Sequence, residues 1–151
     1  MITYIEDKAL KEEIARNILS NLPDWFGVPQ YVEEYVHNSR NLPFWAAMVD
    51  GNYVGFITLK ETSKYAVEIH VMGILKEYHR QGIGRKLFEA LHTYAKEQGY
   101  SFLQVKTVDA GYYEDYDRTR LFYESLGFKA LECFPTLWDA QNPCLVLVMS
   151  L

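Results

Sequence analysis

The sequence predicts an α/β fold of the α+β kind, in which helices cover both faces of a mixed sheet. Strand patterns alternate with amphipathic helical patterns along the chain. Residues 66–97 read as a buried strand, a glycine turn and a helix. Asp50-Gly51-Asn52 separates two apolar runs and is typical of an antiparallel hairpin. With 151 residues, the chain is expected to form one domain over residues 1–151.

The first half of the chain contains three short strand patterns and two helical patterns. Residues 2–5 predict a strand, and Asp7 is a suitable N-cap for a helix that runs to about residue 22. Pro29 favours the first turn of a second helix. Residues 44–49 and 53–60 are the two strands of the hairpin.

The second half continues the alternation and brings the expected number of strands to seven. Residues 66–75 predict the fourth strand, and residues 83–97 a helix that Gln98-Gly99 ends. The remaining elements are a strand at 101–108, a helix at 116–126 ended by Gly127, and strands at 129–134 and 145–149 around a turn containing Pro143.

Composition narrows the function classes. The net charge of -5 and the lack of an extended basic stripe argue against nucleic-acid binding. There is no run of 18 apolar residues and no signal-peptide pattern, so a cytoplasmic protein away from the membrane is expected. Cys133 and Cys144 are expected to be free thiols. The spacing of His, Cys, Asp and Glu suggests no metal site.

Gly82 and Gly84 stand at the entrance of the helix predicted at 83–97. Glycine lets a backbone approach a ligand closely, and the first N–H groups of a helix lack intrahelical partners. Such a terminus binds phosphate or pyrophosphate. His79, Arg80, Arg85 and Lys86 add a local cationic cluster. The alternative is an ordinary tight turn whose basic residues face water.

The anion is not predicted to be a dinucleotide in a Rossmann fold, because Leu87 stands where a third glycine is needed, and the chain has no P-loop. His79-Arg80-Gln81-Gly82-Ile83-Gly84 resembles the acyl-CoA-binding motif of the GNAT superfamily of N-acetyltransferases, Gln/Arg-x-x-Gly-x-Gly/Ala. His79 departs from the motif, and so does Lys76, where many members have proline.

The resemblance covers nearly the whole chain. It implies a mostly antiparallel seven-stranded sheet, splayed between strands four and five, where the pantetheine arm of acetyl-CoA is held. Acetyl-CoA is then a co-substrate. The cofactor-binding residues it implies are Met72, Gly73, Ile74, His79, Arg80, Gln81, Gly82, Ile83, Gly84 and Arg85.

A second motif, Tyr123-Glu124-Ser125-Leu126-Gly127-Phe128, is similar to the Tyr-x-x-x-Gly-Phe signature near the end of GNAT domains. This resemblance makes Tyr123 the candidate general acid. Tyr116 stands where many members have asparagine. The alternative for Tyr123 is a core tyrosine on an amphipathic helix, whose hydroxyl needs a partner in any case.

Glu68 is the candidate general base. It lies fourteen residues before Gly82, the spacing at which some GNAT enzymes place a base glutamate. A carboxylate in an apolar strand is costly unless it is solvated or paired. The alternatives are that Glu68 lies at an exposed strand end without a role, or that His70 or a water is the base.

The resemblance implies that the first two helices and the last strand pair form the acceptor wall, with substrate-binding candidates Trp25, Phe26, Tyr31 and Trp138. This acidic and aromatic region suits a cationic amine. We therefore expect transfer of the acetyl group of acetyl-CoA to a primary amine of a small cationic molecule, by direct attack. The competing hypotheses are a protein lysine or N-terminal amine as acceptor, a catalytically silent CoA-binding regulatory module, and an ATP-binding domain. A homodimer is the candidate oligomeric state.

Overall fold

Seven strands form one sheet in the computed structural model, which describes residues 1–109 and 111–151. The strand order is β1-β2-β3-β4-β5-β7-β6. The strands are β1 (Ile2–Tyr4), β2 (Phe44–Val49), β3 (Asn52–Glu61), β4 (Ala66–Ile74), β5 (Phe102–Val108), β6 (Lys129–Asp139) and β7 (Asn142–Ser150). The helices are α1 (Lys8–Ser20), α2 (Pro29–Ser39), α3 (Ile83–Glu97) and α4 (Glu114–Ser125), with a single 3₁₀ turn at Lys76–Tyr78.

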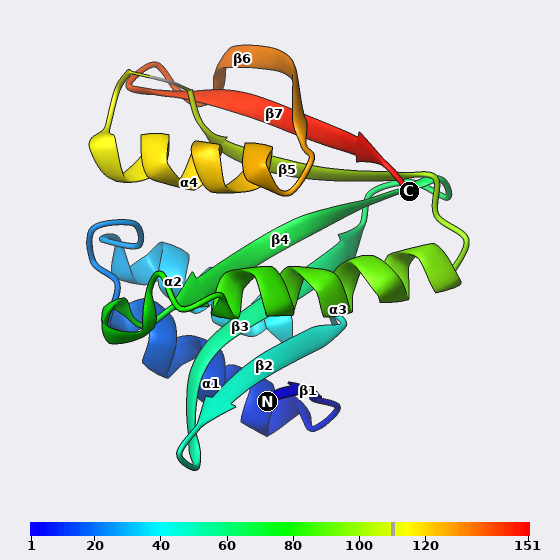
Figure 1. Cartoon of the computed structure of the whole chain (residues 1–151). Helices are drawn as coiled ribbons and strands as arrows, with labels where there is room; N and C mark the ends of the chain where they lie inside the picture. Colours follow the sequence, from blue (N-terminus) through cyan, green and yellow to red (C-terminus); the bar gives the residue numbers. More distant parts are fainter. Residues whose placement is uncertain (110) are drawn as a thin grey trace.

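The sheet separates two helical layers, with α1 and α2 on one face and α3 and α4 on the other (Figure 1). Each layer has its own apolar core. Leu87 and Leu91 of α3 are fully buried against the strands, and Ile18 of α1 is fully buried on the other face. Because residues at helical spacing share one face, the periodicity that predicted these helices also places them on the sheet. Helices on both faces of a mixed sheet are confirmed.

The sheet is splayed between β4 and β5. These are the only parallel neighbours among the described strands, and their pairing covers just Ala66–Glu68 against Phe102–Gln104. All other neighbouring strands are antiparallel. Beyond Glu68 the two strands diverge, and β5 stays paired with β7 along its length (Figure 1). The mostly antiparallel, splayed sheet is therefore confirmed.

A bulge in β4 determines which side chains face α2. The register pairs Thr58 with Val71 and Leu59 with Ile69, so His70 is the extra residue. Ile69 packs in the core below α3, whereas Val71 packs in the core below α1 and α2. A bulge shifts the alternation of faces by one residue. His70 can therefore share the α2 face with Glu68 and with Val71.

The hairpin is confirmed, with Asp50 and Gly51 both at positive φ (50° and 81°), as a type I′ turn requires. The turn predicted around Pro143 is wrong, because β7 begins at Asn142 and β6 continues to Asp139. Pro143 lies where the β6–β7 register is interrupted, between the pairs Phe134–Cys144 and Asp139–Asn142. A residue without an N–H is tolerated at such an irregularity.

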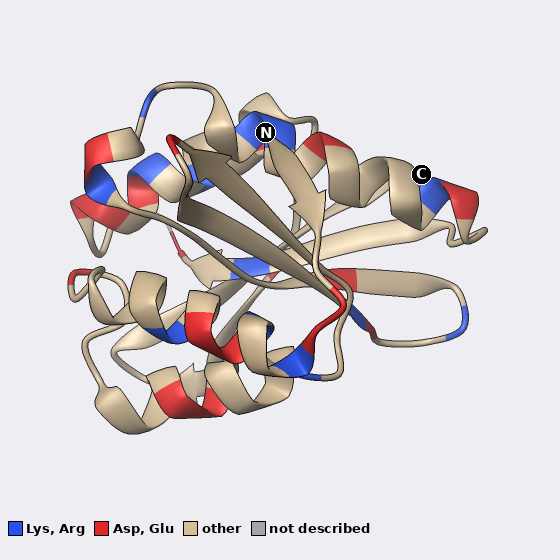
Figure 2. Ribbon diagram, turned by 90° about the horizontal axis from the view of Figure 1, so that it is seen from below, with Lys and Arg blue, Asp and Glu red and all other residues tan. Residues whose placement is uncertain are grey.

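The cysteines, the helices and the charged residues can be compared with the expectations from composition. Cys133 and Cys144 are free, as expected. In the described part of the chain no helix is long and apolar enough to cross a membrane. Figure 2 shows Lys and Arg interspersed with Asp and Glu along the helices, which agrees with the absence of a basic stripe in the sequence.

Candidate active site

The segment between β4 and α3 presents an uncapped helix N-terminus. Gly82 is the N-cap of α3, with φ of 79°, and no side chain caps the helix. A Cβ built at Gly82 meets no atom within 4 Å, so the space beside the first turn is open. The first N–H groups of α3 therefore remain available to an anion. That this anion is the pyrophosphate of acetyl-CoA stays a prediction.

Gly84 has a packing role that the motif alone does not reveal. A Cβ at this position would lie 3.0 Å from Cζ of Phe122 and 3.2 Å from Cδ1 of Ile74. Glycine thus allows α4 and the end of β4 to approach the first turn of α3 closely. The second glycine of the motif fixes the position of α4 relative to the open helix terminus.

Two side chains of the motif support the loop. The His79 ring nitrogen Nε2 lies 2.6 Å from the carbonyl oxygen of Ile74, and the ring lies edge-on to Trp25. The Gln81 amide donates to the carbonyl of Glu77 at 3.2 Å. Arg80 adopts a left-handed conformation with φ of 62°, and its side chain is exposed, as is that of Arg85. Arg80, Arg85 and Lys86 thus expose their charged groups near the helix terminus, while the His79 ring is held within the turn.

The edge of β4 beyond Glu68 directs backbone groups into the gap left by the splay. The N–H groups of Val71 and Leu75 bond to atoms of β3, at Thr58 Oγ1 and at the Val54 carbonyl. Successive residues of a strand point their N–H groups to opposite sides. Hence the N–H groups of Met72 and Ile74 point away from β3, towards β5, and that of Gly73 points towards β3. Within the predicted group, Met72 and Ile74 are the ones placed to polarise a carbonyl.

Glu68 lies at the closed end of the gap, as the last paired residue of β4. It is 8% exposed and forms an ion pair with Lys106 of β5. The exposed position that the alternative expects for Glu68 is therefore wrong, whereas its role as the base stays a prediction. The pairing with Lys106 explains how a carboxylate is accommodated in this strand.

His70 is next to Glu68 on the same face. Its Nε2 is buried and has no hydrogen-bond partner in the described structure, and its ring lies 5.4 Å from that of Tyr35. Burial lowers the pKa of His70 below its ordinary value of 6.5, and the Lys60 ammonium lowers it further. The imidazole is therefore neutral near pH 7, with one nitrogen able to donate and one able to accept.

Tyr123 lies in the core between α4 and α3. It is 6% exposed and contacts the rings of Phe122 and Phe128. Burial raises the pKa of the Tyr123 phenol well above 10. The phenol is therefore protonated throughout the neutral range, as a general acid must be before it acts. Both hypotheses for Tyr123, the catalytic and the structural, are consistent with this location.

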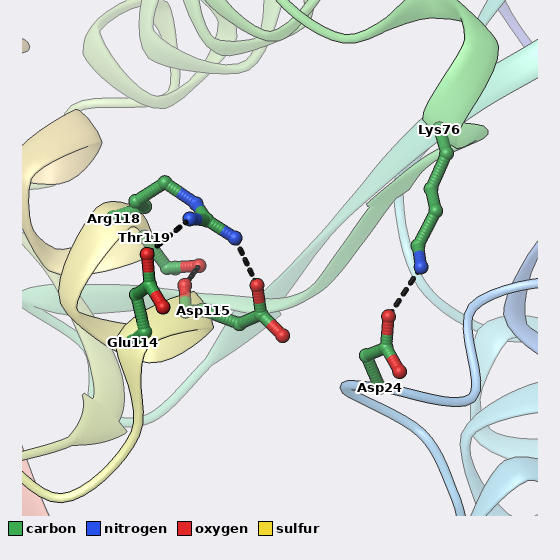
Figure 3. A network of polar contacts seen from close by, with 6 residues as sticks. All are labelled: Asp24, Lys76, Glu114, Asp115, Arg118 and Thr119. Atoms are coloured by element: carbon green, nitrogen blue, oxygen red, sulfur yellow. Dashed lines mark hydrogen bonds and ion pairs between the residues drawn. The ribbon is translucent and has the colours of Figure 1, made fainter.

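The α1–α2 loop closes over the open end of the gap. Asp24 forms an ion pair with Lys76, and the Lys76 ammonium lies 5.7 Å from the centroid of the Trp25 ring. The Tyr116 hydroxyl donates to the carbonyl of Trp25 at 2.9 Å, which links this loop to α4. Figure 3 shows the Asp24–Lys76 pair, with Arg118 between Glu114 and Asp115 on the first turn of α4.

The four acceptor candidates do not all come together. Trp25 lies against the β4–α3 segment, and Phe26 packs edge-on against Tyr35, which in turn contacts His70. Tyr31 and Trp138 are exposed to 59% and 46%, and neither forms a ring contact within the described residues. Of the predicted wall, Trp25 and Phe26 are thus the residues connected to the site.

Sequence reasoning missed Lys106, Tyr35 and Lys60 as site residues. Lys106 and Lys60 project from β5 and β3 on either side of Glu68, and Tyr35 covers His70 from α2. The available signal was alternation, since Gln104 and Lys106 alternate with the buried positions Leu103, Val105 and Thr107. Nothing in the sequence paired that strand with Glu68 in register.

The family model described as Acetyltransferase (GNAT) domain matches residues 40–130, which is more than half of the chain. The chain belongs to the GNAT acetyltransferase family. The N-alpha-acetyltransferase RimI of Mycobacterium tuberculosis is 32% identical over 77 residues, which are 51% of this chain and 44% of RimI. The matched part is therefore less than half of that relative.

Solved structures of GNAT proteins share the fold over almost the whole chain. A GNAT-family acetyltransferase structure from Desulfovibrio desulfuricans superposes with a TM-score of 0.83 at 16% identity, covering 99% of this chain and 98% of that one. An aminoglycoside 6'-N-acetyltransferase complexed with coenzyme A gives a TM-score of 0.78 at 17% identity, covering 99% and 96%. At sequence identities of 16% and 17%, these similarities show a shared fold alone.

Proposed function

We propose that this GNAT protein transfers the acetyl group of acetyl-CoA to a primary amine of a small molecule. One observation carries the proposal. The open N-terminus of α3 and the buried carboxylate of Glu68 lie at opposite ends of the same unpaired edge of β4. This edge runs from an anion-binding terminus to a proton acceptor, which is the order in which a pyrophosphate, a thioester and an amine must be arranged.

The described residues fit acetyl-CoA. The first-turn N–H groups of α3, together with Arg80 and Arg85, would hold the pyrophosphate, because helix N-termini and guanidinium groups both favour anions. The pantetheine arm would lie along β4, where Met72 and Ile74 direct N–H groups into the gap. A carbonyl that accepts one of these hydrogen bonds becomes a better electrophile.

The residues of this chain then supply the proton transfers. An alkyl ammonium has a pKa of roughly 10 and must lose a proton before it attacks. Glu68 would take that proton, directly or through a water, and Tyr123 would give its phenol proton to the departing CoA thiolate. The attacking nitrogen forms the amide bond as the carbon–sulfur bond breaks, and the second proton that this nitrogen loses restores the Tyr123 phenol. Holding the two substrates together supplies a large part of the rate.

A small acceptor is supported by the local enclosure of the site. The α1–α2 loop is tied to the β4–α3 segment by Asp24–Lys76 and to α4 by the Tyr116–Trp25 hydrogen bond. Such ties hold the loop that carries Trp25 and Phe26 across the gap between the β4–α3 segment and α4, which favours a compact amine. The aminoglycoside acetyltransferase with the same fold supports this class. The similarity to RimI makes a protein N-terminal amine the second candidate.

The test is a panel of primary amines and of peptides with a free N-terminal amine, in which the release of CoA thiol is monitored at saturating acetyl-CoA. We expect turnover with small amines and a much lower kcat/KM with peptides. Glu68→Gln should lower kcat/KM strongly near neutral pH and leave acetyl-CoA binding intact, whereas Glu61→Gln, at an exposed position next to Lys60 at the end of β3, should behave as the parent protein.

Three results would overturn the proposal. Acetyl-CoA binding without turnover on any amine would indicate a regulatory CoA-binding module. Competition of ATP with CoA at equal affinity would indicate a nucleotide site. Preferred turnover of peptides would transfer the assignment to protein amines.

A further inference from the structure

We propose that a hollow beside Glu68, between β3, β4 and the end of α2, binds a carboxylate of the acceptor. The acceptor would then be an amino-acid-like molecule with a primary amine at one end and an anionic group at the other. The inference rests on the proposed acetyl transfer, which concerns the amine end of the acceptor. It adds a binding site for the other end of the acceptor.

The hollow has a volume of about 230 Å³. This is below the roughly 300–1,000 Å³ of pockets that enclose a whole ligand, so it suits one end of a small molecule. It lies on the α2 face of the sheet, and its lining consists of His37, Asn38, Asn41, Leu42, Lys60 and His70.

The lining offers hydrogen-bond donors and a positive charge. Lys60 is exposed and forms no ion pair among the residues that the structure describes. The buried Nε2 of His70 has no partner there either. Asn38 and Asn41 add amide groups, and no carboxylate is in the lining. A buried polar nitrogen without a partner is costly, and a turn of the imidazole towards the hollow would let a carboxylate oxygen satisfy it. The ligand chemistry indicated is an anion with two acceptor oxygens.

The position of the hollow relative to Glu68 determines the shape of the acceptor. Lys60 is the register partner of Glu68 across β3 and β4. Directly opposed residues share one face and have Cβ atoms about 4.5–5.5 Å apart. An amine at Glu68 and a carboxylate at Lys60 are therefore separated by a few carbon atoms. Both groups can belong to one small amino acid.

The same arrangement disfavours acceptors with several positive charges. Glu68 lies between Lys60 on β3 and its ion-pair partner Lys106 on β5. An incoming ammonium competes with Lys106 for the carboxylate, and a second positive charge on the acceptor would meet Lys60. Like charges at close range are destabilising, whereas a carboxylate on the acceptor turns the same lysine into a partner. A net-cationic polyamine is thus the poorer acceptor, and the proposal departs in this respect from the cationic acceptor expected from the sequence.

The test compares three primary amines of equal length: 5-aminopentanoate, n-pentylamine and 1,5-diaminopentane, with homologues from two to six carbons. Their amino groups have similar pKa values, so differences report the far end of the molecule. We expect kcat/KM for the best amino acid to exceed that of the alkylamine by roughly tenfold to a hundredfold, and the diamine to rank last.

Substitutions at Lys60 locate the effect. Lys60→Gln should lower kcat/KM for the amino acid at least several-fold more than for n-pentylamine, mainly through a higher KM, and Lys60→Glu should reverse the order in favour of the diamine. Lys64→Gln serves as the matched control, because Lys64 lies in the β3–β4 connection over the ring of Tyr65. A preference for the neutral amine or diamine in the parent protein, or an equal loss for all three amines in Lys60→Gln, would overturn the proposal.

A binding measurement separates this proposal from the proposed activity. The affinity of 5-aminopentanoate for the CoA-loaded protein is measured by calorimetry, with and without Lys60→Gln. If no amine is acetylated but Lys60→Gln weakens this binding, the carboxylate site stands and the acetyl transfer is wrong. If alkylamines are acetylated and Lys60→Gln leaves the binding unchanged, the activity stands and the carboxylate site is wrong.

Discussion

Replacing Gly84 by alanine tests whether close packing of α4 explains the second glycine of the motif. In an open helix this change stabilises a protein, since alanine is better than glycine by up to about 1 kcal/mol. Here the new Cβ would lie 3.0 Å from Phe122 and 3.2 Å from Ile74, where ordinary contacts are 3.4–4 Å. Forcing a methyl group into packed surroundings costs about 1–3 kcal/mol. We expect a net loss of about 0–2 kcal/mol in the free energy of unfolding.

A double-mutant cycle measured by urea unfolding gives the decisive number. Shortening the opposing ring with Phe122→Leu makes room for the methyl group, so Gly84→Ala should be neutral or stabilising by up to about 1 kcal/mol in that background. The expected coupling between the two positions is about 1–3 kcal/mol. A gain of about 1 kcal/mol from Gly84→Ala in the parent protein, with no coupling to Phe122, would refute the packing explanation.

Three further predictions concern the remaining site. Gly82→Val should weaken acetyl-CoA binding in calorimetry and reduce the thermal stabilisation that acetyl-CoA gives, because φ of 79° is unfavourable for a β-branched residue. The open space around Gly82 avoids a clash within the protein. Full-strength binding by the folded variant would contradict the anion site. Tyr123→Phe should keep acetyl-CoA affinity and lower single-turnover rates by roughly 10²–10⁴-fold, with Tyr94→Phe in α3 as control; an unchanged rate would leave Tyr123 a core residue. Burial lowers the pKa of His70 below its unfolded value of 6.5, so the unfolded chain binds a proton first and stability falls as the pH drops below about 6.5. The urea midpoints at pH 7.5 and 5.5 should therefore differ less in His70→Gln than in the parent protein. An equal difference in both proteins would show that His70 does not contribute.

Local patterns explain why so much of the fold could be predicted. Asp50-Gly51 favours a type I′ turn through φ values that the two residues themselves permit, and Gly82 provides a left-handed N-cap for α3 in the same way. The apolar spacing of α3 determined which face is buried, because helical periodicity is a property of the segment alone. Glu68 was identifiable for a similar reason, since an acidic residue in an apolar strand stands out without knowledge of its neighbours.

The errors arose where a side chain depends on a distant segment. The turn expected at Pro143 was misplaced because β6 continues past its own apolar pattern, supported by pairing with β7. Tyr31 and Trp138, which the resemblance groups with Trp25, are exposed and form no ring contact with it among the described residues, so their part in binding the acceptor stays a prediction. Residue type does not determine which aromatic rings the chain brings together.

The sequence by itself determined the order of strands and helices, the glycine turn before α3 and the identity of the candidate base. Tertiary structure decided the partners: Lys106 beside Glu68, Lys60 opposite it, and Phe122 against Gly84. The physical reason is the range of the forces involved. Backbone preferences and amphipathic periodicity act over a few residues, whereas the register of β4 with β3 and β5 depends on the packing of segments far apart in the chain, and that register places two lysines on either side of one buried carboxylate.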